Sequence, residues 1–197
     1  MALFLVTCVA AQPPTPFQEY VRAVSEHSDR LQRLAQERQD HVKTWRVYPV
    51  VEALHALRGV QFTVAVTLVA EMGDLTRFES PRELMKFMGL MPSEYASGEH
   101  RRQGMITKAG NTHARRVLVE GAWASRDPAT VSRHVQRRLA HQPNVSQDLR
   151  WKAHVRLCQR YRRLGARGQH ANVVTVAMAR ELAGFMWASA KEVPVIA

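Results

Sequence analysis

The sequence predicts an all-α fold: a helical bundle with a helix-hairpin-helix-like element and a long N-terminal helix of the coiled-coil kind. Apolar residues recur at helical spacing in successive segments of the 197-residue chain, and this periodicity is the main signal for amphipathic helices. Proline and glycine fall mainly between those segments, where they end one helix and separate it from the next. We therefore expect one helical domain over residues 49–190, preceded by a separate helical arm.

The arm is expected at residues 17–48. Val21, Val24, Leu31 and Leu34 are spaced by three, seven and three residues, and no proline or glycine interrupts them. A long polar helix with such a narrow apolar stripe is more typical of a coiled coil or hairpin arm than of a core helix. The chain ends are expected to lie outside both parts: residues 1–16 as a ragged or non-native start, because their apolar run lacks a basic flank, and residues 191–197 as a tail.

Residues 51–78 contain two apolar helical segments on either side of a short turn at residues 57–60. Helix, tight glycine turn and helix is the layout of a helix-hairpin-helix. In that element, backbone N–H groups at the turn and at the following helix N-terminus can hold a nucleic-acid phosphate. An ordinary corner between two helices, with Gly59 as a C-cap, is the alternative. The sequence leaves both interpretations open.

Further helices are predicted along the rest of the chain. Ser80 and Pro81 suit the N-cap and first position of a helix, with Glu83 three residues after the cap. This helix is expected to end near Gly89. Residues 90–108 contain one proline and two glycines and are expected to form a loop. The remaining helices are predicted at about residues 111–125, 129–141, 146–164 and 171–190.

Positive charge is concentrated in one third of the chain. Residues 99–167 hold sixteen Lys and Arg against four Asp and Glu, whereas the remainder holds twelve against thirteen, so this segment supplies the whole formal net charge of +11. A surplus this localised is typical of proteins that bind a phosphate backbone. A solvated helix surface is the alternative, but it would show interspersed rather than localised charge.

The segment 90–108 also carries a candidate nucleophile. Ser97 is followed by Gly98 and then by Arg101, Arg102 and Lys108. A serine hydroxyl attacks a phosphodiester only when positive charge neutralises the phosphate oxygens, and the arginine fork supplies that charge in a fixed geometry. This composition suits phosphoryl transfer, with the three cations orienting the phosphate, or plain phosphate binding.

Several other residues are candidate nucleic-acid contacts. Asn111 begins the helix after the loop, where an exposed helix N-terminus would give a second seat for an anion. The predicted nucleic-acid-binding set is Gly59, Gly98, Asn111, Arg115, Arg116, Arg160 and Arg163.

No cofactor or metal site is indicated by the spacing of ligand residues. Two cysteines give neither a disulfide framework nor a zinc pattern, and the nine histidines are scattered. The carboxylates are dispersed, so none stands out as a two-metal nuclease site. No charge-free stretch reaches the length of about 20 residues that a membrane span needs, and we expect no membrane partner and a cytoplasmic, nucleoid-associated location.

At the level of motifs, the chain resembles one family of insertion-sequence transposases. The segments that carry the resemblance occur in the family's order: ALRGV (56–60), AEMGDLTRFESPRELMKFMGLMPSEYASG (70–98), ITKAGNTHARRVLVEGAW (106–123), RLCQRYRRLGARG (156–168) and ARELAGFMWA (179–188). They are similar to the C-terminal half of the Piv/MooV-type, bridge-RNA-guided transposases, the IS-one-ten group. The similarity covers roughly residues 17–190.

This resemblance implies a function for the chain. By position in the SG motif, Ser97 matches the serine that becomes covalently joined to DNA in that family. The partners implied are DNA, a structured noncoding guide RNA and further copies of the chain, since the arm is similar to the family's coiled-coil segment. Mg²⁺ is expected only with the family's RuvC-like acidic domain.

The chain departs from the family pattern in lacking that RuvC-like half. We therefore expect a truncated or split DNA transposase, possessing the serine but not the acidic metal site, which a separate polypeptide would supply. Gln169, where the family pattern has lysine, is a smaller departure. The alternative is a catalytically inactive remnant that binds nucleic acid.

Overall fold

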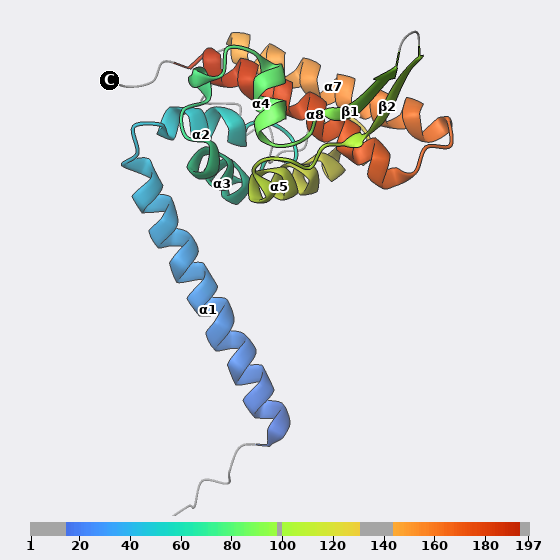
Figure 1. Ribbon diagram of the computed structural model, residues 1–197. Coiled ribbons are helices and arrows are strands. Elements are labelled where there is room, and N and C mark those ends of the chain that lie inside the picture. Colours follow the sequence, from blue (N-terminus) through green and yellow to red (C-terminus); the bar gives the residue numbers. More distant parts are fainter. Residues whose placement is uncertain (1–14, 98–99, 131–143, 194–197) are drawn as a thin grey trace, which may run out of the picture. The chain divides into compact units, whose positions relative to one another are not determined.

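A computed structural model describes residues 15–97, 100–130 and 144–193. The described residues are almost entirely helical, with one short two-stranded sheet, which confirms the predicted all-α class (Figure 1). The chain divides into two compact units, one up to Thr44 and the other from Trp45 onwards.

The first unit contains a single helix, α1 (Pro16–Lys43). A capping box begins it: the Thr15 hydroxyl accepts a hydrogen bond from the Gln18 N–H, and the Gln18 side chain accepts one from the Thr15 N–H. The helix predicted from residue 17 is therefore confirmed. Its large apolar side chains from Phe17 to Leu34 are exposed, Phe17 and Tyr20 each at 75%, so packing within the described residues does not account for them.

The second unit consists of several short helices and two long ones, and the last helix is central. Its elements in chain order are α2 (Tyr48–His55), α3 (Phe62–Met72), η1 (Leu75–Arg77), α4 (Pro81–Phe87), β1 (Pro92–Ser97), β2 (His100–Ile106), α5 (Thr112–Ala122), η2 (Trp123–Arg126), α7 (Asn144–Ala166) and α8 (Ala171–Lys191). Helix α8 contacts α2, α4, α5 and α7. Its apolar face is fully buried at Met178, Leu182 and Met186.

The start of α4 follows the predicted capping pattern. The Ser80 hydroxyl accepts a hydrogen bond from the Glu83 N–H, and Pro81 occupies the first turn. The Glu83 carboxylate in turn accepts a hydrogen bond from the Glu79 N–H at 2.9 Å. These bonds give α4 a defined start, and Gly89 lies two residues after its end.

Within the predicted loop at residues 90–108, residues 92–97 and 100–106 form the two strands of a β-hairpin. Strands β1 and β2 pair in antiparallel fashion from Pro92 opposite Ile106 to Ser97 opposite His100. Pro92 stands at the first position of its strand, where a missing N–H does little harm. The strands are short and polar and pair only with each other, so the sequence lacks the apolar alternation that would have identified them.

Two other predicted segments cannot be compared with the structure. The predicted basic helix at residues 129–141 falls largely on residues 131–143, and the N-terminal start falls on residues 1–14; both lie outside the described residues. The helices expected near residues 146–164 and 171–190 are confirmed as α7 and α8.

Two glycines set the distance between the α2–α3 turn and α5. Gly59 has a φ of +82°, and a Cβ built on it would lie 2.1 Å from the Gly121 carbonyl oxygen. A Cβ on Gly121 would in turn lie 2.8 Å from the Gly59 carbonyl oxygen. The turn and the helix therefore touch backbone to backbone, and neither position has room for a side chain.

Replacing Gly59 is predicted to destabilise the second unit strongly. Gly59→Ala combines an unfavourable positive φ with a backbone clash, so the free energy of unfolding in urea should fall by more than about 3 kcal/mol. Gly168→Ala is the matched control, because Gly168 has a φ of +76° and nothing within 4 Å of an added Cβ. It should cost only about 1–2 kcal/mol. Equal losses for the two variants would contradict the close contact.

Candidate functional site

Ser97 is exposed and is the last residue of β1, next to the hairpin tip. It pairs with His100, and the neighbouring pairs are Ala96 with Arg101 and Tyr95 with Arg102. The backbone positions of the two arginines therefore lie one and two pairs from the serine, and opposite residues of such a ladder are about 5 Å apart. The hairpin extends beyond the helices (Figure 1), and predicted contact Gly98 lies outside the described residues.

Lys108 lies at the other end of the hairpin. The six residues from Pro92 to Ser97 span roughly 17 Å of strand, and Lys108 follows the Ile106 position that pairs with Pro92. The structure therefore brings Arg101 and Arg102 toward Ser97 but does not bring Lys108 there. Lys108 instead helps to form the base, where its N–H donates to the Gly89 carbonyl at 3.0 Å.

The base of the hairpin is joined to α4 and α5 by backbone hydrogen bonds. Besides that of Lys108, the Thr107 N–H donates to the Met91 carbonyl at 2.8 Å, and the Asn111 N–H donates to the Phe87 carbonyl at 2.9 Å. Gly89 makes the close approach possible, since a Cβ there would lie 2.4 Å from the Ala109 carbonyl oxygen. The hairpin thus stands on the end of α4 and the start of α5.

Arg115 reinforces this base and has a structural role. Its Nη1 donates to the Met88 carbonyl at 2.9 Å and to the Lys108 carbonyl at 3.1 Å, and its Nη2 donates to the Thr112 hydroxyl at 3.2 Å. Arg116, its neighbour, is exposed and pairs only with Glu120, at 3.2 Å. Of these two predicted nucleic-acid contacts, Arg116 is the more available for a ligand.

Asn111 caps α5 and also contacts Glu71, a carboxylate that was not among the residues predicted from the sequence. Its Oδ1 accepts from the Ala114 N–H, and its Nδ2 donates to Glu71 at 2.8 Å. His113 Nδ1 contacts the other oxygen of Glu71 at 2.7 Å. Hydrogen bonds from Asn111 and then His113 lower the pKa of Glu71 below its usual value. The Glu71 carboxylate therefore lies beside the N-terminus of α5, which was predicted to bind an anion.

The turn between α2 and α3 is also occupied by contacts within the chain. Gly59 packs on Gly121, while the Arg58 Nη1 donates to the Pro128 carbonyl at 2.7 Å and contacts the His154 ring. Burial, followed by the nearby charge of Arg58, lowers the pKa of His154 to about 4, so the ring is neutral and accepts the bond. These contacts give the turn a role in packing, and phosphate binding there stays a prediction.

The two predicted arginines of α7 lie beside α8. Arg160 Nη1 donates to Glu181 at 2.7 Å, and Arg163 is exposed one turn further along. Arg156, which was not among the predicted contacts, pairs with the other oxygen of Glu181. The spacing of residues 156, 160 and 163 places all three on one helix face, and that periodicity could have identified Arg156 from the sequence.

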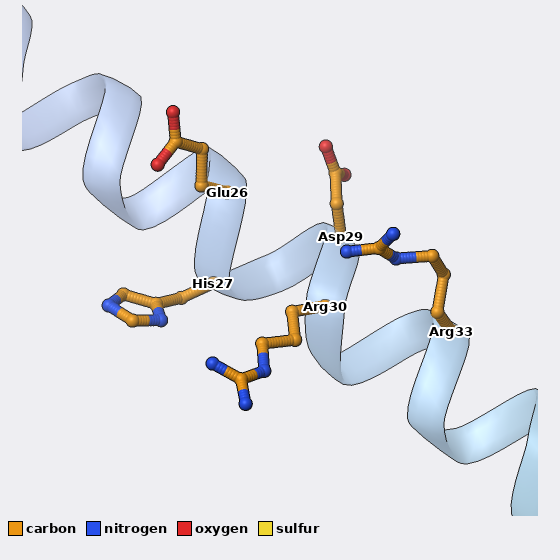
Figure 2. Close-up of a pocket in the computed structure, with 5 residues that line it drawn as sticks. All are labelled: Glu26, His27, Asp29, Arg30 and Arg33. Carbon is orange, nitrogen blue, oxygen red and sulfur yellow. The ribbon is translucent and has the colours of Figure 1, made fainter.

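No metal centre or enclosed ligand cavity stands out in the described part of the chain. No group of three or more His, Cys, Asp or Glu residues there could hold a metal ion. A hollow of about 600 Å³ is lined by Glu26, His27, Asp29, Arg30 and Arg33 of α1 alone. Figure 2 shows these side chains spreading outward from one exposed helix. Among the described helices, none is long and apolar enough to cross a membrane.

Arg115 is predicted to be more important for stability than its neighbour. Arg115→Gln removes hydrogen bonds to two backbone carbonyls, and the free energy of unfolding in urea should fall by about 1–3 kcal/mol. Amide exchange at Thr107 and Lys108 should accelerate as the base opens. Arg116→Gln removes an exposed pair with the same change in charge and should cost less than about 0.5 kcal/mol. Equal effects would refute the assignment of Arg115 to the hairpin base.

Comparison with known proteins agrees with the resemblance at the level of the family. The chain is 48% identical over 153 residues to a protein of Sinorhizobium fredii described as transposase y4qE, covering 78% of this chain and 39% of that protein. It is 31% identical over 195 residues to a Pseudomonas aeruginosa protein described as a family 20 transposase, covering 95% and 50%. A transposase for insertion sequence element IS1111A from Coxiella burnetii is 28% identical over 102 residues, covering 52% and 25%.

The chain therefore spans half or less of the length of these relatives. Residues 51–136 match the model of the Transposase IS116/IS110/IS902 family. The matched segment includes the serine hairpin and α5, whereas α7 and α8 follow it. Over residues 51–136, this chain is thus similar to the IS116/IS110/IS902 transposase family.

Proposed function

We propose that this chain provides the serine-bearing domain of a DNA transposase, with Ser97 as the nucleophile. The observation that carries the proposal is the position of Ser97, exposed next to the hairpin tip, with the backbone positions of Arg101 and Arg102 one and two pairs away. The residues lie within the segment that matches the transposase family. An exposed serine on a projecting hairpin has the access that a strand of DNA requires.

The proposed reaction is a transesterification. The Ser97 Oγ forms a bond to phosphorus, the bond between phosphorus and a sugar oxygen breaks, and the hydroxyl proton passes to a base while the sugar oxygen gains a proton. Arg101 and Arg102 would neutralise the charge that builds on the phosphate oxygens. The product is a DNA strand joined to Ser97 and a free sugar hydroxyl, so the phosphodiester energy is conserved for rejoining.

The proposed reaction at Ser97 includes no metal ion bound by the described residues. The described residues contain no cluster of three or more ligand side chains that fits a metal. Mg²⁺, which the family resemblance implies, would come with an acidic domain outside these residues. That domain would add charge neutralisation at the same phosphate.

The proposed partners are DNA and a structured guide RNA. The surplus of positive charge over residues 99–167 supports binding to a phosphate backbone of either kind. The RNA partner rests on the family resemblance. The most available of the predicted contacts are Arg116 and Arg163, because both side chains are exposed.

Ser97→Ala is predicted to abolish covalent attachment to DNA. The chain, an acidic domain from a full-length relative, element-end DNA and its RNA would be combined and examined on a denaturing gel. The wild type should give a protein–DNA adduct, and Ser97→Ala should give none while binding DNA equally well. Ser93→Ala is the control: that hydroxyl donates to the Met105 carbonyl at 3.0 Å within the hairpin, so its adduct should persist.

An adduct that survives in Ser97→Ala would overturn the nucleophile. Binding to DNA without any adduct from the wild type would instead favour a nucleic-acid-binding remnant.

The helical arm is proposed to join two copies of the chain. On α1, Phe17, Tyr20, Val24, Leu31 and Leu34 recur at intervals of three, four, seven and three residues, and all are exposed. These intervals follow the a and d positions of a coiled coil, which bury such side chains against a partner helix. A second copy of the chain presents the same apolar stripe, so the two stripes can bury each other.

Leu31→Asp is predicted to separate the two copies. Leu31 is 69% exposed, so the substitution leaves the isolated chain intact while placing a charge in the proposed seam. Sedimentation equilibrium should show a dimer for the wild type and a monomer for Leu31→Asp. Gln32→Asp adds the same charge beside the stripe and should remain dimeric. A monomeric wild type at micromolar concentration would refute the seam.

A further inference from the structure

One face of α7 forms an open groove lined by positive side chains. The groove has a volume of about 540 Å³ and is lined by Arg156, Gln159, Arg160 and Arg163. The three arginines follow one another at about one helical turn, or 5.4 Å, along the axis. The groove therefore presents a short row of guanidinium groups with an amide between them.

A single carboxylate orients two of these arginines. Glu181 of α8 is 11% exposed; one of its oxygens accepts from Arg156 Nε, and the other accepts from Arg160 Nη1 at 2.7 Å. The Arg156 and Arg160 side chains remain 68% and 37% exposed. Because a guanidinium has five N–H donors, each retains donors that the carboxylate does not use.

The charges around Glu181 are unbalanced. Two arginines of the groove pair with one carboxylate, and Arg163 on α7 and Arg180 on α8 add further positive charges. Burial, followed by the charge of Arg160, lowers the pKa of Arg180. Its Nε is buried and has no hydrogen-bond partner in the described residues. Positive charges held this close are stabilised when an anion lies between them.

We propose that this groove binds the phosphate backbone of a polynucleotide, with Arg156, Arg160 and Arg163 as the contacts and Glu181 as their positioning residue. The groove deepens the proposed function, on which it rests, by giving the helical domain a second nucleic-acid surface on elements that carry no part of the serine hairpin. Arginine forks match phosphate oxygens in a bidentate manner. The lining offers no apolar or aromatic group for a base, so recognition is through the backbone.

The test measures binding of the full chain to a DNA duplex and to an RNA duplex of equal length and unrelated sequence, by fluorescence anisotropy over a range of salt concentrations. For the paired change Arg156→Gln with Arg163→Gln, Kd at 0.1 M salt should rise about tenfold or more, and the log–log salt slope should be shallower by about two. Comparison of the two duplexes identifies which polymer the groove prefers.

Two controls distinguish binding at the groove from binding that depends only on the net positive charge of the chain. Arg22→Gln with Arg33→Gln removes the same charge from exposed positions of α1 beside its apolar stripe, and should change Kd by less than about twofold. Glu181→Gln adds positive charge, so binding governed by net charge would tighten. If Glu181 positions the arginines, binding should weaken instead. A thermal melt confirms that each variant is folded.

The outcomes distinguish this inference from the proposed function. Equal losses for the α7 and α1 pairs, or tighter binding by Glu181→Gln, would overturn the groove while leaving the Ser97 adduct unaffected. A groove-dependent loss of binding without any Ser97 adduct would support the groove and refute the nucleophile. No binding of either duplex by the wild type would overturn both.

Discussion

The position of the serine hairpin depends on how two chain segments are held together at its base. The end of α4 and the start of α5 meet through backbone hydrogen bonds, and Arg115 donates to carbonyls from both sides. Gly89 allows this approach, since a Cβ there would overlap the Ala109 carbonyl. Because α4 and α5 both pack on α8, the hairpin is connected through its base to the core of the second unit.

The positive charges of this chain have two different roles. Arg58, Arg115 and Arg160 donate to groups of the chain itself and connect helices that are distant in sequence. Arg116 and Arg163 are exposed, and Arg116 pairs with an exposed carboxylate, that of Glu120, one turn away. A local surplus of charge therefore identifies a region that attracts phosphate, but individual arginines within it divide between holding the fold and contacting a ligand. An internal hydrogen bond to a carbonyl does not neutralise the guanidinium, so even structural arginines contribute to the long-range field.

Much of the helical architecture could be predicted, because helix periodicity and caps are local properties. Ser80, Pro81 and Glu83 marked the start of α4, and the helix expected at residues 171–190 is α8. The hairpin was missed because its strands are polar and pair only with each other, so the sequence gives no alternation of apolar residues. Ser97 could be identified as a candidate because arginines follow it in the sequence. Its separation from Lys108 could not be predicted, because it depends on the intervening residues forming a strand rather than a loop.

The sequence by itself determined the helices, the uneven charge and the presence of a serine among arginines, since each depends on residues within a few turns of one another. Tertiary structure decided which of those residues are available. Glu71 reaches Asn111 and His113 across about forty positions, and Glu181 reaches Arg156 and Arg160 across more than twenty. Gly59 of the α2–α3 turn meets Gly121 of α5 backbone to backbone across about sixty positions. Pairings of this kind depend on how helices pack, and packing is a property of the whole core that no local pattern contains.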